Sequence, residues 1–259
     1  MDLQLRGKRA FVTGSTQGIG FAIAHALAAE GAAVLLNGRD AARTHAAADR
    51  LRALVLGADI DVAPGDVTDP GAFADLPEID ILVHNAGAFG LNEFAGTDDA
   101  EWQRYLDVNL MAGARLSRRV LAGMRERRWG RIMFIASESG VNVPADMIPY
   151  GVSKAATIAL GNGLAKLTRG TEVTVNTVLG GPTYSDGVAS VVESIAAAQG
   201  VPADAVAASV IGQNRTTLLE RFIRPEEIAA LVAFLASPRA SAINGAALRA
   251  DGGVLTGML

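Results

Sequence analysis

The sequence contains no cysteine, and it has only three lysines, three histidines and three tyrosines. The absence of cysteine excludes disulfide scaffolds, thiol catalysis and cysteine-ligated metal sites. The histidines lack the spacing of metal ligands, so we expect no metal centre. No segment approaches the roughly 18 uninterrupted apolar residues of a membrane-spanning helix. A net charge of −4 argues against a nucleic-acid binder held by bulk positive charge. We therefore expect a cytoplasmic globular protein without a nucleic-acid or membrane partner.

Two kinds of apolar segment alternate along the 259 residues. Short continuous runs predict buried strands near 10–12, 34–36, 60–62, 79–83, 131–135, 173–175 and 247–248. Helical spacing predicts helices at 19–30, 41–56, 98–128 and 150–168, with helical pieces up to about 236. Continuous apolar strands between helices indicate a parallel sheet covered on both faces. The sequence thus predicts an α/β fold: one doubly wound, Rossmann-type domain over 1–259, with about seven strands.

Three glycines separate the first predicted strand from the first predicted helix, in the pattern Gly14-x3-Gly18-x-Gly20. In a dinucleotide site, Gly14 would allow a tight turn and Gly18 would let backbone approach the pyrophosphate. Gly20 would let the helix pack closely on the strand, with the phosphates at the helix N-terminus. A plain strand-to-helix turn that needs positive φ would use the same glycines, and the spacing alone leaves both interpretations open.

A tyrosine and a lysine stand four positions apart in the helix predicted at 150–168. Residues i and i+4 share one helix face, so the ammonium of Lys154 is expected near the phenol of Tyr150. A nearby cation lowers the pKa of a phenol, and such a tyrosine can exchange a proton with a ketone or an alcohol. An exposed helix turn with two unrelated side chains is the alternative.

The glycine spacing and the Tyr-x3-Lys pair together resemble the short-chain dehydrogenase/reductase family, most generally its 3-oxoacyl-thioester reductase-like members. The resemblance implies a serine thirteen positions before Tyr150, which is Ser137, to hydrogen-bond the substrate oxygen. Ser139 is the competing choice, but its spacing does not match. The Asp-Val-Asn-Leu segment matches the family's helix asparagine, which makes Asn109 the residue that holds a water for proton relay.

The resemblance also implies the cofactor contacts. Asp66 would bond the adenine with Val67 nearby, although a loop cap is the alternative for Asp66. Lys154 would bond the nicotinamide ribose. The full set of implied cofactor-binding residues is Gly14, Ser15, Gln17, Gly18, Ile19, Gly20, Arg39, Asp66, Val67, Asn85, Ala86, Gly87, Tyr150, Lys154, Gly181 and Thr183.

Two positions depart from the family pattern. His84 stands where the family has the first asparagine of Asn-Asn-Ala-Gly. We interpret it as a structural histidine whose ring nitrogens replace the hydrogen bonds of an amide, rather than as a catalytic base. Gly180 replaces a proline in the loop expected after the sixth strand. Because glycine leaves φ free where proline restricts it, we expect a looser nicotinamide clamp.

The end of the second predicted strand indicates the cofactor. An acidic residue there would select NAD, whereas an arginine accommodates the 2′-phosphate of NADP. The family's NAD-selecting aspartate falls at Gly38, and Arg39 follows directly. Gln17 stands where many NADP users carry a second basic residue, and Asp40 could repel a phosphate. We expect NADP, with NAD as the alternative.

The resemblance implies hydride transfer between NAD(P)(H) and a carbonyl or alcohol substrate. A non-catalytic NAD(P)-binding regulatory protein of the same fold is the alternative, which the complete set of four catalytic residues disfavours. A serine hydrolase is excluded because no Gly-x-Ser-x-Gly is present. Residues 184–224, with an apolar helical set, are expected to form a lid over the substrate. A homotetramer, or a homodimer, is expected by analogy.

Overall fold

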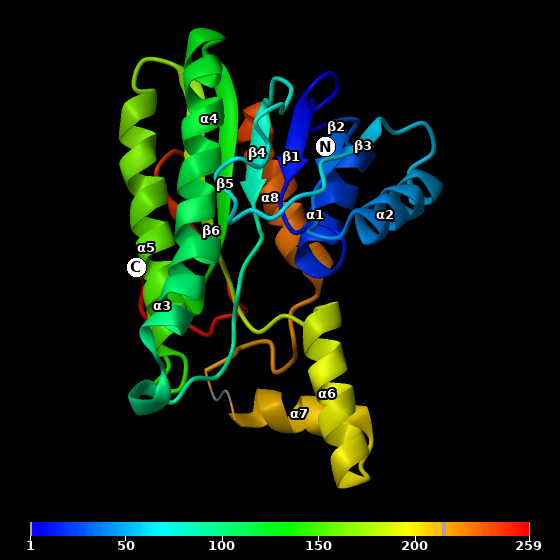
Figure 1. The fold of residues 1–259 in the computed structure, drawn as a ribbon, viewed down its shortest axis with the longest axis vertical. Coiled ribbons are helices and arrows are strands. Elements are labelled where there is room, and N and C mark those ends of the chain that lie inside the picture. The colour runs from blue at the N-terminus through cyan, green and yellow to red at the C-terminus, as the bar shows by residue number, and fades with distance from the viewer. Residues whose placement is uncertain (1, 214–215, 259) are drawn as a thin grey trace.

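The computed structural model describes residues 2–213 and 216–258. Its centre is a parallel sheet of seven strands in the order β3-β2-β1-β4-β5-β6-β7 (Figure 1). The strands are β1 Arg9–Val12, β2 Ala33–Leu36, β3 Ile60–Val62, β4 Ile81–His84, β5 Trp129–Ser137, β6 Glu172–Gly180 and β7 Ala247–Ala250. The strand order reverses direction between β1 and β4, which is the switch point where doubly wound folds bind ligands. The predicted fold class is confirmed.

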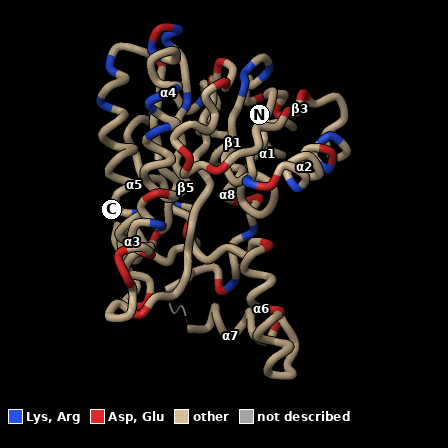
Figure 2. The backbone as a smooth tube through the Cα atoms, viewed as in Figure 1, with Lys and Arg blue, Asp and Glu red and all other residues tan. Residues whose placement is uncertain are grey.

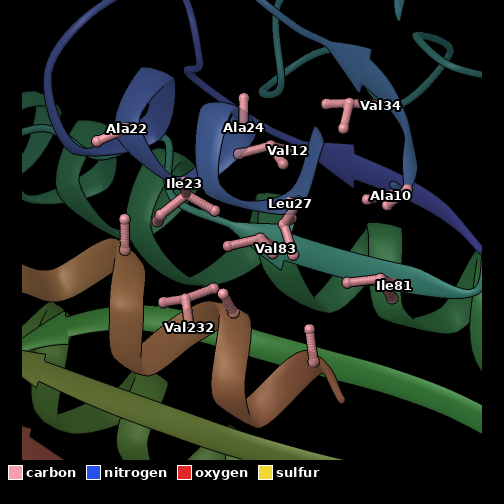
Figure 3. Packing of buried hydrophobic residues seen from close by; sticks show 14 of the residues in the cluster. Ala10, Val12, Ala22, Ile23, Ala24, Leu27, Val34, Ile81, Val83 and Val232 are labelled. Carbon is pink, nitrogen blue, oxygen red and sulfur yellow. The ribbon is translucent and has the colours of Figure 1, made fainter. Parts of the chain in front are cut away.

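Eight α-helices flank or extend the described sheet. They are α1 Gly18–Ala29, α2 Ala41–Leu54, α3 Asp99–Leu106, α4 Ala112–Glu126, α5 Ile148–Ala165, α6 Asp186–Gln199, α7 Ala203–Gln213 and α8 Pro225–Ala236. One core cluster joins α1, α2 and α8 to one face of the sheet. Figure 3 shows the part of this cluster in which Val232 of α8 and residues of α1 pack near the strands. A second cluster joins α4 and α5 to the other face. Both faces are therefore covered, as the continuous apolar strands predict.

Two predicted segments differ from the structure. The strand expected at 173–175 continues to Gly180, so Gly180, expected in the loop after this strand, is the last residue of β6. Residues 176–180 stay extended because β6 pairs with β5 on one side and with β7 on the other. The helix expected at 98–128 is divided by a π-helical turn, η2 Asp107–Met111. Side-chain periodicity cannot show either feature, because both depend on backbone pairing.

The segment expected to be a lid contains α6 and α7, which project beyond the carboxyl ends of the strands (Figure 1). Residues 214–215 of this segment lie outside the described residues. The two helices share a small apolar cluster centred on Val192, Ala196 and Val206, and Figure 2 shows few charged residues along them. No single described helix is long and apolar enough to cross a membrane; α6 and α7 reach that length and composition only as a pair bent by 112°.

Candidate active site

The four residues expected to carry the chemistry converge at the carboxyl edge of the sheet. Ser137 ends β5, Tyr150 and Lys154 belong to the first turns of α5, and Asn109 lies in η2. Because all strands are parallel, this edge also collects the loops that follow β1, β2 and β4. The sheet thus places the Tyr-x3-Lys pair and the glycine loop on the same side of the molecule.

Ser137 is buried, and its hydroxyl is engaged by several neighbours. Its Oγ donates a short hydrogen bond to the carboxylate of Glu138 and accepts the backbone N–H of Ser139 at 3.1 Å. Tyr150 is a further hydrogen-bonding neighbour. The Ser139 hydroxyl donates to Glu138 instead, at 3.2 Å. Of the two serines that the sequence offers, Ser137 is therefore the one that interacts with Tyr150.

Lys154 is only 6% exposed, and its ammonium lies near the ring of Tyr150. Its Nζ donates to the backbone carbonyl of Ile135 at 2.8 Å and lies 5.6 Å from the centroid of the Tyr150 ring. The i, i+4 spacing therefore puts the two side chains together, as expected. Burial lowers the pKa of Lys154 to about 8, because the apolar surroundings disfavour the charged amine.

The acidity of Tyr150 differs from the expectation. Burial raises the pKa of Tyr150 to about 12; hydrogen bonding to Ser137 opposes this rise, and the charge of Glu138 adds to it. The prediction that Lys154 lowers this pKa is therefore wrong for the protein by itself. The Lys154 ammonium bonds to Ile135 rather than to the phenol oxygen. The phenol of Tyr150 therefore keeps its proton throughout the neutral range.

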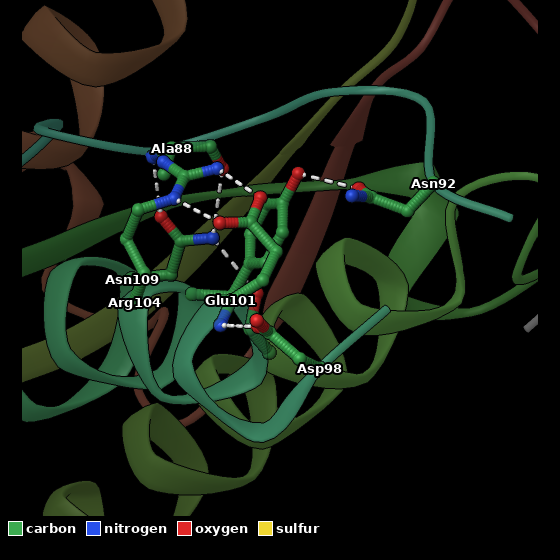
Figure 4. Close-up of polar contacts among 8 residues, drawn as sticks. Ala88, Asn92, Asp98, Glu101, Arg104 and Asn109 are labelled. Carbon is green, nitrogen blue, oxygen red and sulfur yellow. Dashed lines mark hydrogen bonds and ion pairs between the residues drawn. The ribbon is translucent and has the colours of Figure 1, made fainter. Parts of the chain in front are cut away.

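Asn109 is 1% exposed and ties η2 to the helix that carries the tyrosine. Its amide exchanges two hydrogen bonds with the backbone of Ala88, at 2.8 and 3.0 Å, and donates to Ser153 Oγ at 2.8 Å (Figure 4). Ser153 donates in turn to the backbone carbonyl of Tyr150 at 2.6 Å. The Asn109 carbonyl accepts from Thr157 at 3.0 Å. Asn109 therefore positions the start of α5 through its side chain.

The glycine loop has the conformation that the spacing predicts. Gly14 and Gly18 have φ of 60° and 57°, a region that disfavours other residues. A Cβ on Gly20 would lie 2.3 Å from the carbonyl oxygen of Gly14, so α1 can approach the loop only with glycine at this position. A Cβ on Gly14 would lie 3.0 Å from the Cα of Ala86, which brings the loop close to the end of β4.

The N-terminus of α1 already interacts with an anionic oxygen. Asp186, at the start of α6, accepts the backbone N–H of Gly18 at 2.5 Å. Gln17 is the N-cap residue, but its side chain makes no capping bond and accepts instead from Arg43. A carboxylate at this position shows that the free N–H groups and the dipole of α1 accommodate negative charge.

His84 joins the glycine loop to η2 and is fully buried. Its Nε2 faces the carbonyl of Val108 at 3.1 Å and must donate, so its Nδ1 accepts from the hydroxyl of Thr13 at 3.2 Å. Thr13 Oγ1 then accepts the backbone N–H groups of Asn85 and Ala86. Burial lowers the pKa of His84 to about 4, so the ring is neutral. This geometry favours the interpretation of His84 as structural.

The end of β2 has an unengaged arginine and no room for an acid. A Cβ on Gly38 would lie 2.5 Å from Cγ2 of Thr16, so an aspartate does not fit there without movement. Arg39 is exposed, and its guanidinium has no hydrogen-bond partner among residues 2–213 and 216–258. Asp40 accepts from the backbone of Arg43 as the N-cap of α2. The Asp40 carboxylate is therefore engaged by a helix end.

Two expected cofactor residues use their side chains within the protein. Ser15 is fully buried; its hydroxyl donates to the carbonyl of Val12 and accepts the N–H of Asn37. One oxygen of Asp66 accepts both the N–H and the hydroxyl of Thr68, and these bonds lower the pKa of Asp66, with Arg39 contributing. One carboxylate oxygen of Asp66 therefore acts as the loop cap that the sequence offered as the alternative role of this residue.

Three further expected cofactor residues, Gly87, Gly181 and Thr183, follow β4 and β6. A Cβ on Gly87 would lie 3.5 Å from Lys154 Nζ, so this glycine borders the ammonium of Lys154. A Cβ on Gly181 would lie 2.5 Å from the carbonyl oxygen of Asp251, which explains a glycine directly after β6. Thr183 is buried and donates to the carbonyl of Gly181 at 2.9 Å.

Sequence reasoning missed four residues that shape this site. Glu138 and Ser153 stand within the motifs themselves, one beside Ser137 and one inside Tyr-x3-Lys, so their positions offered a signal. Thr13 directly follows β1 and offered a weaker signal. Asp186 offered none, because its contact with Gly18 spans 168 positions of sequence.

Comparisons with known proteins show which family this chain resembles. The family profile described as short chain dehydrogenase matches residues 8–196. An uncharacterized oxidoreductase of Bacillus subtilis, YvaG, is 45% identical, with 98% of each chain covered. The 3-oxoacyl-(acyl-carrier-protein) reductase FabG of Escherichia coli is 33% identical, over 97% of this chain and 99% of that protein.

A solved structure is similar along its whole length. L-sorbose reductase from Gluconobacter frateurii, in complex with NADPH and L-sorbose, superposes with a TM-score of 0.93 at 32% identity, and the match covers 100% of both chains. The chain therefore belongs to the short-chain dehydrogenase family, a family of oxidoreductases, as the sequence motifs indicate.

Proposed function

We propose that this short-chain dehydrogenase is an NADP(H)-dependent oxidoreductase that interconverts a carbonyl and an alcohol, with Tyr150 as the acid and base. The observation that carries the proposal is the convergence of Tyr150 with Ser137, Lys154 and Asn109 at the carboxyl edge of the sheet. The solved complex of L-sorbose reductase with NADPH and a ketose supports the same class of chemistry.

The residues at this edge fit a dinucleotide. The N-terminus of α1 accommodates an anionic oxygen at Gly18, which is the charge that a pyrophosphate would bring. Gly14 lets the loop approach the end of β4 closely, because a Cβ on Gly14 would lie 3.0 Å from the Cα of Ala86. The bound nicotinamide supplies or accepts the hydride, and the protein supplies orientation and the proton.

The chain's own residues would divide the remaining work. The hydroxyl of Tyr150 gives its proton to the substrate oxygen during reduction and recovers it during oxidation. Ser137 hydrogen-bonds the same oxygen and orients it. The ammonium of Lys154 stabilises the phenolate that remains after proton transfer. Asn109 holds the start of α5 in place and, as the family resemblance implies, binds a water that returns the proton.

Replacement of the tyrosine tests this assignment. Tyr150→Phe removes the transferable proton while keeping the ring, so kcat should fall by about a hundredfold or more with any carbonyl substrate. The affinity for NADPH, measured by fluorescence titration, should stay within about twofold. Full turnover by a folded Tyr150→Phe protein would show that another group transfers the proton.

The preference for NADP is proposed from Arg39 and Gly38. The guanidinium of Arg39 is free to bind a 2′-phosphate through two hydrogen bonds, and Gly38 leaves no acid to bind a ribose hydroxyl. In Arg39→Asp, the ratio of kcat/KM for NADPH over NADH should fall by about tenfold or more. Arg6→Asp, at the opposite edge of the sheet, is the matched control. An unchanged ratio in Arg39→Asp would remove Arg39 from this role.

A further inference from the structure

A carboxylate without a cationic partner stands beside the proposed reacting position. Glu138 is half-buried at the start of the turn η3 Glu138–Gly140, directly after Ser137. Its two oxygens accept hydrogen bonds from the hydroxyls of Ser137 and Ser139. None of the ion pairs found in the described parts of the chain includes Glu138. Among the described residues, the hydrogen bonds to its carboxylate come from these two hydroxyls.

The serine beside it has a single proton. In the structure, Ser137 donates that proton to Glu138. When a carbonyl substrate accepts the hydrogen bond of the Ser137 hydroxyl, the carboxylate of Glu138 loses that hydrogen bond. Glu138 then keeps only the longer bond from Ser139. A half-buried charge that loses a hydrogen bond is costly, so a substrate that replaces the lost donor is favoured over one that does not.

We propose that Glu138 sets the substrate class, by selecting neutral substrates with a hydroxyl on the carbon next to the reacting carbonyl. This inference rests on the proposed function. The adjacent hydroxyl donates to the carboxylate of Glu138 while the carbonyl accepts from Ser137 and Tyr150. A substrate with a carboxylate in the same place meets like charge at close range and is rejected. Simple hydroxy ketones and ketoses fit this description.

The surface next to the site has the same sign of charge. A groove of about 740 Å³ is lined by Glu93, Asp98 and Glu101, with Arg104 as its one cationic side chain. Arg104 is already paired with Glu101 at 2.6 Å (Figure 4). Tyr105 separates this groove from the site, and its ring centroid lies 6.4 Å from that of Tyr150. The carboxylates that line this groove add a negative potential beside the site, which disfavours anionic substrates as well.

Three substrates with the same four-carbon skeleton isolate the interaction. They are 1-hydroxybutan-2-one, butan-2-one and 2-oxobutanoate, in which the carbonyl carbon carries a hydroxymethyl, a methyl and a carboxylate group, respectively. With NADPH, the native protein should have the highest kcat/KM for the hydroxy ketone and the lowest for the oxo acid. Because the three carbonyls differ in intrinsic reactivity, the decisive quantity is the change of each ratio on mutation of Glu138.

In Glu138→Gln and Glu138→Ala, the preference for the hydroxy ketone over butan-2-one should shrink by between about tenfold and a hundredfold, the range of one hydrogen bond to a charged group. The relative kcat/KM for 2-oxobutanoate should rise in both variants. Glu126→Gln, an exposed glutamate on α4, is the matched control and should change neither ratio.

Unchanged ratios in both Glu138 variants would overturn the assignment. If the variants do not fold, the native protein decides alone: an oxo acid turned over better than the hydroxy ketone, or no turnover of any of the three, contradicts the assignment. The proposed function is judged separately, because it depends on the effect of Tyr150→Phe with any carbonyl substrate.

Discussion

The buried lysine of the candidate active site should destabilise the fold. The pKa of Lys154 falls from 10.5 to about 8 because burial disfavours the charged amine. One pKa unit corresponds to about 1.4 kcal/mol, so keeping Lys154 charged in the folded protein costs about 3 kcal/mol near neutral pH. Lys154→Met removes this cost with a side chain of similar length. The lost hydrogen bond to Ile135 offsets about 1 kcal/mol, which leaves a net gain of about 2 kcal/mol.

The pH dependence of this gain follows from the direction of the pKa shift. The folded protein gives up the proton of Lys154 near pH 8, whereas the unfolded chain holds it until about pH 10.5. Between these values the unfolded state binds more protons, so the stability of the native protein rises with pH. Below pH 8 both states are charged and the full cost applies. The advantage of Lys154→Met should therefore be largest at pH 7 and nearly gone at pH 9.5.

Urea unfolding, followed by tryptophan fluorescence and circular dichroism, measures both quantities. The midpoint and slope are compared at pH 7 and pH 9.5, at one protein concentration. Lys166→Met replaces an exposed lysine just after α5 and should change stability by less than about 0.5 kcal/mol. The reasoning is refuted if Lys154→Met is less stable than the native protein at pH 7, or if its advantage does not shrink at pH 9.5. Turnover should be lost in the same variant.

Three further outcomes follow from the site. His84→Asn should keep turnover within about threefold, and lost turnover in a folded variant would make His84 catalytic. Because burial lowers the pKa of His84 to about 4, the native protein should lose stability as the pH falls from about 6.5 to 4, and His84→Asn should lose less. Gly20→Ala places a methyl group 2.3 Å from the Gly14 carbonyl oxygen, so NADPH binding should weaken by at least about tenfold. Unchanged binding in a calorimetric titration would contradict the close packing of α1 on the glycine loop. Asp186→Asn removes a negative charge from Gly18 and should tighten NADPH binding about two- to fivefold, a gain that weaker binding would rule out.

Much of the fold was predictable because its signals are local. Continuous apolar runs and helical periodicity identified the strands and the main helices, and the alternation of the two implied a parallel sheet. The pairing of Tyr150 with Lys154 was equally accessible, because helix geometry alone puts i and i+4 on one face. The conformation of the glycine loop was accessible for a similar reason, since positive φ at Gly14 and Gly18 is a property of single residues.

The extent of β6 and the break at η2 were not predictable in the same way. Residues 176–180 remain extended because they pair with β5 and β7, which lie far away in the sequence. The π-helical turn is a backbone feature that the side-chain pattern of 98–128 does not show. In both cases the deciding hydrogen bonds join backbone groups, and these are nearly the same for every residue type.

The sequence by itself determined the pairing of Tyr150 with Lys154, because helix spacing is a local pattern, and its resemblance to a known family added Ser137 and Asn109. Only the tertiary structure decided their chemical state. Tyr150 has a raised rather than a lowered pKa because burial outweighs its neighbours, and the lysine ammonium bonds to Ile135 instead of to the phenol. The hydroxyl of Ser137 donates its one hydrogen bond to the carboxylate of Glu138. Burial and hydrogen-bond direction depend on all the groups that pack around an atom, so they exist only once the chain has folded.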